Sequence, residues 1–169
     1  NNVIYANTNQ SVLIDHGTKH RLINNTIYQA VTDVNAAVLV QGSASDVFFA
    51  NNIFWVDKGG AITVASGSTT GFSSDYNLFL MTQVTETDRA SIGSWLGTAM
   101  TTLSDWQDET TGTGQDGNSI EVVETWENIR AQFMDIEGAD NKLGQDVVDL
   151  YTKDTGSDDN FGLRKFSDA

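Results

Sequence analysis

The chain has 169 residues, a net charge of −14 and no cysteine, which fits one domain, or one with a small second, and excludes disulfides and thiolate chemistry. Residues 1–80 hold 5 acidic and 3 basic residues (net −2), and residues 81–169 hold 18 acidic and 6 basic residues (net −12). A surface with this much negative charge repels phosphate backbones and anionic membranes, so we expect no nucleic-acid partner. No apolar run approaches the roughly 20 residues of a membrane helix, so we expect no membrane insertion.

A short motif recurs four times in the first half of the chain. Its copies are Asn2-Val3-Ile4-Tyr5, Asn24-Asn25-Thr26-Ile27-Tyr28, Asn51-Asn52-Ile53-Phe54 and Tyr76-Asn77-Leu78-Phe79. Aligned on Ile4, Ile27, Ile53 and Leu78, the copies lie 23, 26 and 25 residues apart, a period typical of solenoid proteins. We expect these four side chains to form one column in the solenoid interior, and Val12, Val38 and Ile62 to form a second.

Each repeat contains three short apolar runs separated by turns. In the fullest coil the runs are residues 37–40, 47–49 and 53–56, rich in β-branched and aromatic residues. No hairpin signal such as Asn-Gly joins them, so each run should pair with its equivalent in the next coil. The sequence therefore predicts an all-β fold, a parallel β-helix with three parallel sheets. Asn25 and Asn51 fall at the equivalent turn position, with Asn2 before them, and should stack as a hydrogen-bonded ladder.

The repeat fades from Met81, so we predict coils in residues 1–80 and a capping region of the same solenoid in residues 81–169. One helix is expected at 102–107, with Thr101 or Thr102 as its cap. A second is expected at about 125–134 with Thr125 as its cap, where Trp126, Ile129 and Phe133 would share one face. Residues 161–166 alternate weakly in polarity, which is compatible with a last strand.

Residues 1–80 resemble the coils of right-handed parallel β-helix proteins of the pectate-lyase-like superfamily, in which a Val/Ile-x-Val-x-Gly strand precedes Asn-Asn-x-Ile-Phe/Tyr. The motifs at 102–107, 114–119, 133–135 and 161–163 are similar to those at the end of bacterial surface proteins of this kind. The chain departs from the pattern by lacking an Asp-Pro before Phe133 and a Ser-Pro-Ala-Ile-Asp ending. The resemblance implies an irregular, partly helical, acidic C-terminal cap over the strand edges of the solenoid.

The same resemblance implies an extracellular or bacterial cell-surface location and association with polysaccharide. The chain would then be part of a larger carbohydrate-active or carbohydrate-binding protein, with further N-terminal coils of that protein as its partner. Two alternatives stay open: a structural or adhesive stalk without sugar chemistry, and the C-terminal tail of a polysaccharide lyase or epimerase whose active site precedes Asn1. Whether the parent protein is an enzyme does not follow from the fold.

In the resembled family, polysaccharide lies along the sheet that carries the Val-x-Val strands. A lyase or epimerase there needs a neutralised carboxylate and a base. The outward positions supply neither a carboxylate pair nor a base, so no catalytic residue is assigned; they are Leu13, Leu39 and Thr63, followed by Asp15, Gln41 and Ala65. The candidates for substrate binding are Asp15, His16 and Gln41.

The turn 15–21 holds both histidines, and it allows a second interpretation. His16 or Lys19 would act as a base and Arg21 would bind a uronate, whereas the alternative is a solvated turn of the coil.

Ca²⁺ is the cofactor that the acidic loops 137–141 and 154–160 would suit, although neither has the ligand spacing of an EF-hand. Solvated loops are the alternative, and no metal ligand is assigned. Asp116, in a glycine-rich turn, is expected to cap or brace the backbone rather than to bind metal. Trp55, Trp95 and Trp106 are candidates for stacking on sugar rings, and Trp126 is predicted to lie in the core.

Overall fold

The computed structural model describes residues 2–7, 9–30, 35–85, 88–131, 133–135 and 160–163. The chain divides into two compact units, Asn1–Glu124 and Thr125–Ala169, which are described separately. Strands dominate the described residues, and both helices there are five residues long. In that part of the chain no helix has the length and apolar character needed to span a bilayer.

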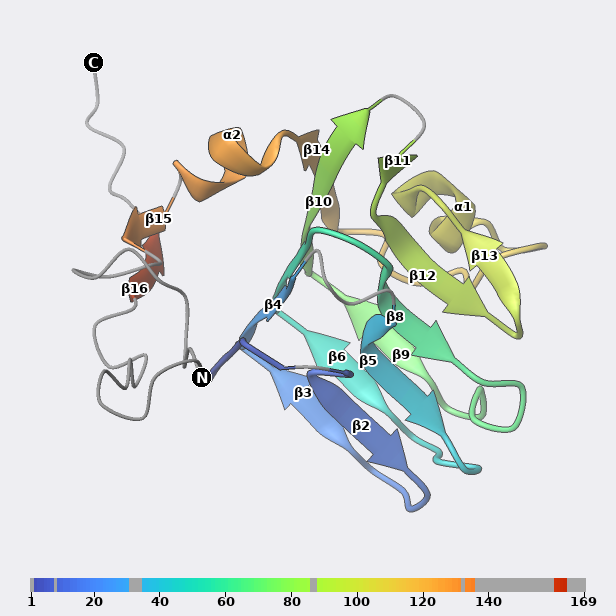
Figure 1. The fold of residues 1–169 in the computed structure, drawn as a ribbon. Coiled ribbons are helices and arrows are strands. Elements are labelled where there is room, and N and C mark those ends of the chain that lie inside the picture. The colour runs from blue at the N-terminus through green and yellow to red at the C-terminus, as the bar shows by residue number, and fades with distance from the viewer. Residues whose placement is uncertain are drawn as a thin grey trace. The chain divides into compact units, whose positions relative to one another are not determined.

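The first unit is built from three sheets, and each of the first three coils contributes one strand to each of them (Figure 1). Sheet 1 contains β1 (Val3–Ile4), β4 (Thr26–Gln29), β7 (Ile53–Val56), β10 (Leu78–Thr85), β14 (Ile120–Glu124) and the antiparallel β11 (Asp88–Arg89). Sheet 2 contains β2 (Val12–Asp15), β5 (Ala36–Gln41), β8 (Gly60–Val64), β12 (Ser91–Trp95) and the antiparallel β13 (Thr98–Met100). Sheet 3 contains β3 (Arg21–Ile23), β6 (Phe48–Ala50) and β9 (Ser73–Asp75). Equivalent strands of successive coils pair in parallel, which confirms the predicted parallel β-helix.

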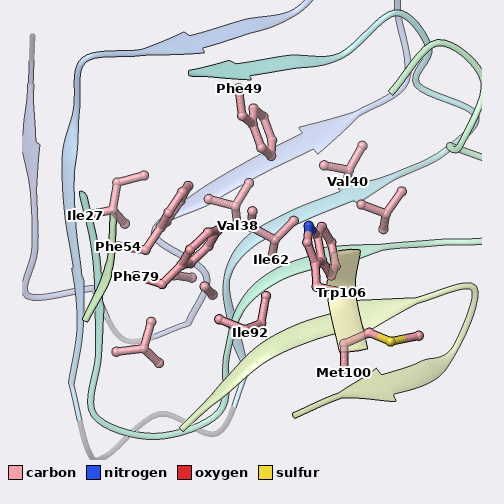
Figure 2. Packing of buried hydrophobic residues seen from close by; sticks show 14 of the residues in the cluster. Ile27, Val38, Val40, Phe49, Phe54, Ile62, Phe79, Ile92, Met100 and Trp106 are labelled. Carbon is pink, nitrogen blue, oxygen red and sulfur yellow. The ribbon is translucent and has the colours of Figure 1, made fainter. Parts of the chain in front are cut away.

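The interior column of sheet 1 consists of Ile4, Ile27, Phe54 and Phe79, which are register partners along the sheet. The predicted places of Ile53 and Leu78 in this column are wrong, because Ile53 pairs with Thr26 and Leu78 pairs with Ile53 on the opposite face of the sheet. The correct step from Ile27 is to Phe54, which is 27 residues, and a slip of one residue moves a side chain to the other face of a sheet. The rings of Phe54 and Phe79 stack with centroids 5.3 Å apart (Figure 2).

The interior column of sheet 2 is confirmed, since Val12 pairs with Val38 and Val38 with Ile62. Val38 and Ile62 are fully buried, and Figure 2 shows them facing the column of sheet 1. Full burial of each such side chain is worth about 1.5–3 kcal/mol. This apolar interior holds the coils together.

Parallel pairing continues beyond residue 80, where β12 pairs with β8 and β14 with β10. After β13 comes the helix α1 (Leu103–Gln107), and Thr102 is its N-cap. The Thr102 hydroxyl accepts a hydrogen bond from Asp105 N, and the Asp105 carboxylate accepts one from Thr102 N. This capping box confirms the predicted helix and its cap. Trp106 of α1 is fully buried in the same apolar cluster as the sheet 2 column, with its ring centroid 6.2 Å from that of Phe72.

Glu121 joins the cap to the last coil. It is a charged residue at an inward position, in register with Phe79. Its carboxylate accepts a hydrogen bond of 3.0 Å from Leu103 N at the start of α1 and forms an ion pair with Arg89. Arg89 also donates to the carbonyl of Thr101. A carboxylate therefore replaces an apolar rung where the coils meet the helix, and it satisfies one of the open N–H groups there.

The second unit contains α2 (Trp126–Arg130), β15 (Phe133–Asp135) and β16 (Asn160–Leu163), the two strands being antiparallel. Thr125 caps α2 as predicted, but the helix ends at Arg130. Phe133 pairs with Leu163 in the β15–β16 ladder and so does not lie on the helix face. Trp126 is only half-buried, with the Arg130 guanidinium 5.1 Å from its ring centroid, so its predicted core position is wrong. Residues 136–159 and 164–169, with most of the proposed calcium loops, lie outside the described residues.

Candidate functional site

Asp15, His16 and Gln41 meet at the exposed end of β2 and β5. Asp15 and Gln41 are register partners, and His16 N donates a hydrogen bond of 3.2 Å to Gln41 O. The Asp15 carboxylate lies 2.8 Å from His16 Nδ1, with the two side chains 43% and 75% exposed. Gly42, at φ +66°, makes this packing possible, since a Cβ there would collide with both side chains. The structure thus brings the three predicted substrate-binding residues together; their role stays a prediction.

The rest of this turn is held against the next coil by hydrogen bonds. Lys19 N donates to Ser45 O at 3.0 Å, and the Thr18 hydroxyl donates to the Asp46 carboxylate at 2.9 Å. His20 Nε2 lies 3.0 Å from His16 O. The Arg21 guanidinium lies 5.7 Å from the Phe48 ring centroid. The proposed roles of His16 or Lys19 as base and of Arg21 as uronate binder are not tested by these contacts.

The outer face of sheet 2 is formed mainly by uncharged side chains. Leu13, Leu39, Thr63 and Ser94 follow one another in register along it, and Leu13 is exposed. Among the residues that the structure describes, no three His, Cys, Asp or Glu side chains are grouped so as to hold a metal ion. The described part of this face thus offers hydrogen-bonding and apolar groups rather than a carboxylate pair.

An asparagine ladder fixes the corner between sheet 3 and sheet 1. Asn25 N and Nδ2 both donate to Asn52 Oδ1 at 3.1 Å, and Asn52 N and Nδ2 donate to Asn77 Oδ1 at 2.9 and 3.1 Å. Asn2 makes the same pair of bonds to Asn25. The predicted ladder is confirmed, but its rung in the third coil is Asn52 and not Asn51, which is exposed. This error and the misplacement of Ile53 both come from an alignment of the coils that is shifted by one residue.

Asp116 terminates the ladder. Its carboxylate is buried and accepts hydrogen bonds from Asn77 Nδ2 at 2.9 Å, Ser119 Oγ at 2.5 Å and Trp106 Nε1 at 2.9 Å. Its backbone N donates to Ser74 O at 2.8 Å. The carboxylate thus has a structural role, although it contacts side chains rather than backbone groups, and it links the cap helix to the ladder.

Asp57 lies at the centre of a second buried polar cluster, which the sequence did not reveal. Its carboxylate accepts hydrogen bonds from the Tyr28 hydroxyl at 2.5 Å, the Thr82 hydroxyl at 2.6 Å and Trp55 Nε1 at 3.1 Å. Burial raises the pKa of this carboxyl above its usual range, and the three donors only partly offset that effect. The only sequence signal is the period-2 spacing that puts Trp55 and Asp57 on one strand face.

Two of the three tryptophans proposed for sugar stacking are fully buried, so that prediction is wrong for Trp55 and Trp106. Each indole N–H donates to a buried carboxylate, that of Asp57 or Asp116. Trp95 is half-buried, and its ring packs against Phe72 with centroids 5.5 Å apart. An indole can bury its ring in a core with its N–H bonded to an acceptor, or it can lie at a surface, so its position in the sequence does not decide its role.

Outside the ladder, the same corner presents an exposed side chain on each of four successive coils; they are Asn24, Asn51, Tyr76 and Asn118. We call these four residues the corner row. Each precedes by two residues a member of the register series Thr26, Ile53, Leu78 and Ile120. A shallow open pocket of about 320 Å³ lies at the first two rungs, lined by Asn24, Asn25, Thr26, Asn51 and Ile53.

Comparisons of the chain with protein-family models, with curated proteins and with solved structures gave no match. The functional proposals therefore rest on the geometry of the described residues.

Proposed function

We propose that the chain is an extracellular β-helix module that associates with polysaccharide, as part of a larger carbohydrate-active or carbohydrate-binding protein on a bacterial surface. The observation that supports this most is the cluster of Asp15, His16 and Gln41. Their side chains offer hydrogen-bond donors and acceptors at one exposed coil edge, which is what recognition of sugar hydroxyl groups requires. The resemblance of the coils to pectate-lyase-like proteins agrees with this function.

Binding without bond cleavage is the version of this function that the site supports best. The described face beside the cluster contributes one carboxylate, from Asp15, next to uncharged residues such as Leu39 and Thr63. Elimination or epimerisation of a uronan needs a base placed at the C5 proton and a partner that neutralises the carboxylate. We therefore propose that any catalytic coils of the parent protein are other than those described.

The second candidate is a structural or adhesive stalk. The largely uncharged outer face of sheet 2 favours it, since Leu13, Leu39, Thr63 and Ser94 form no polar groove of their own. In either case we propose that a further coil adds to β1, β2 and β3. These are the edge strands at one end of the three sheets, and the apolar side chains there are only partly covered.

Affinity electrophoresis and calorimetry against soluble polysaccharides test the proposal. We expect binding by the wild-type chain and an affinity at least about fivefold lower for the double variant His16→Asn, Gln41→Ala. This variant replaces the imidazole by a shorter amide, which tolerates the positive φ at position 16, and removes the amide of Gln41. Ser104→Ala, on the exposed side of α1, is the control and should bind as wild type. Failure of the wild-type chain to bind any polysaccharide would favour the stalk.

A uronan incubated with the chain and Ca²⁺ tests the noncatalytic role. We expect no rise in the ultraviolet absorbance of unsaturated sugar products. Such a rise would show that this chain carries lyase activity and would overturn the proposal of binding alone.

A further inference from the structure

Tyr76 departs from the pattern of the corner row. The two preceding coils place Asn24 and Asn51 at this position with φ of +58° and +55°, and Tyr76 has φ of +56°. Asparagine adopts this left-handed conformation readily, whereas a bulky side chain with positive φ is strained. Tyrosine at this position therefore carries backbone strain that asparagine would not.

Among the residues that the structure describes, no ring contact or side-chain hydrogen bond of Tyr76 offsets this strain. The residue is 60% exposed, and none of the aromatic contacts between described residues involves its ring. Its backbone is nevertheless held firmly, because the Asp75 carboxylate accepts hydrogen bonds from Tyr76 N at 2.9 Å and Asn118 N at 2.8 Å. A strained, exposed and well-positioned aromatic side chain points to a ligand outside the fold.

The rest of the corner row supplies groups that complement an aromatic ring. The side chains of Asn24 and Asn51 are exposed and make no hydrogen bond to another residue that the structure describes, so their amide groups face solvent. Beside them runs an apolar strip, in which Ile53 and Leu78 are half-buried and Ile120 is 61% exposed. With neighbouring strands about 4.8 Å apart, the four rungs span about 14 Å along the axis.

We propose that the corner row is a binding site for a neutral polysaccharide chain lying along the solenoid axis. The Tyr76 ring stacks on the apolar face of a sugar ring, and Asn24 and Asn51 exchange hydrogen bonds with hydroxyl groups on neighbouring sugars. The row contains no cation, and the net charge of −14 repels anionic polymers, so a uronan is not the ligand of this site. This inference rests on the proposed function and adds to it a second site and a glycan class.

The variant Tyr76→Asn tests the site because it separates binding from stability. Asparagine restores the residue of the preceding coils and relieves the positive φ, so the thermal midpoint should rise. The loss of the ring should weaken binding of neutral cello- and manno-oligosaccharides about three- to tenfold in calorimetry. Tyr76→Phe keeps the ring and should bind within about twofold of wild type.

Leu96→Asn is the matched control. Leu96 is also exposed and apolar, and with φ of +55° it occupies the same backbone conformation in the β12–β13 turn. Its replacement should raise the midpoint in the same way and leave glycan affinity unchanged. Equal loss of affinity in both variants would contradict the site.

The outcomes separate this site from the proposed function. Unchanged affinity of Tyr76→Asn for the neutral oligosaccharides would overturn the corner row as a binding site. The proposed function would still stand if the His16→Asn, Gln41→Ala variant lost binding. Tighter binding of oligogalacturonate than of the neutral probes, weakened by Tyr76→Asn, would overturn the glycan class. No binding of any probe by the wild-type chain would contradict both proposals.

Discussion

Replacing Asn52 by alanine should remove the central rung of the asparagine ladder. Asn52 is buried, its Oδ1 accepts two hydrogen bonds from Asn25, and its Nδ2 donates to Leu22 O at 2.8 Å and to Asn77 Oδ1 at 3.1 Å. Each such bond contributes about 0.5–1.5 kcal/mol, and a buried N–H left without an acceptor, as Asn25 N would be, costs about 1–3 kcal/mol. Allowing for local relaxation, we expect a loss of about 3–4 kcal/mol in the free energy of unfolding.

The measurement is urea denaturation followed by circular dichroism, with Asn51→Gly as the control. Asn51 is adjacent to Asn52 but is exposed and has φ of +55°, a conformation that glycine adopts without strain. The control should therefore stay within about 0.5 kcal/mol of wild type. A larger loss for Asn51→Gly than for Asn52→Ala would refute the register in which Asn52 is the buried rung and would restore the alignment on Ile53.

Three further predictions concern the core, the cap and the buried carboxyl. Ile27→Asp should abolish folding, since it puts an unpaired charge at a fully buried position; cooperative unfolding with unchanged stability would contradict the β-helix. Trp106→Ala should cost about 3–5 kcal/mol by calorimetry, because it leaves a cavity under the cap and removes a donor to Asp116; a loss as small as that of Ser104→Ala would show that α1 does not close the core. Burial raises the pKa of the Asp57 carboxyl in the folded state, so its neutral form stabilises the fold at low pH. This stabilisation is lost as the pH rises from about the pKa of the unfolded state through that of the folded state. Asp57→Asn should flatten this fall in the thermal midpoint with pH, and an unchanged slope would assign the pH dependence to other groups.

The architecture and the first helix could be predicted because their signals are local. Period-2 apolar runs with glycine and asparagine between them specify strands and turns, and the absence of hairpin turns leaves pairing between coils. The capping box of α1 is also local, since Thr102 and Asp105 lie three residues apart.

Register could not be fixed from the sequence, because two alignments one residue apart both look reasonable. Alignment on apolar residues matches Ile27 with Ile53, whereas alignment on the Asn-Asn pair matches Ile27 with Phe54. The structure follows the second, since the buried amide of each Asn needs the next one as its partner. Ile53 is apolar and yet lies on the outer face, so polarity alone misplaces it.

The candidate site was only partly predictable for a related reason. Asp15 and His16 are neighbours in sequence, and the predicted β2–β5 register brought Gln41 beside them. Tyr76, in contrast, becomes distinctive only when its backbone conformation is compared with that of Asn24 and Asn51 in the preceding coils. In the Asp57 cluster, Thr82 and Tyr28 lie 25 and 29 positions from Asp57 in the sequence, and the three residues meet only because equivalent strands of successive coils pair.

The most direct test of the proposed glycan binding is a titration of the isotopically labelled chain with a neutral cello- or manno-oligosaccharide, followed by amide chemical shifts in NMR. We predict saturable shifts at the corner row, at Asn24, Asn51, Tyr76 and Asn118, with smaller ones along the strip at Ile53 and Ile120. Shifts confined to the turn of Asp15 and His16 would place the glycan there and contradict the second site. The absence of saturable shifts anywhere would contradict polysaccharide binding by this chain.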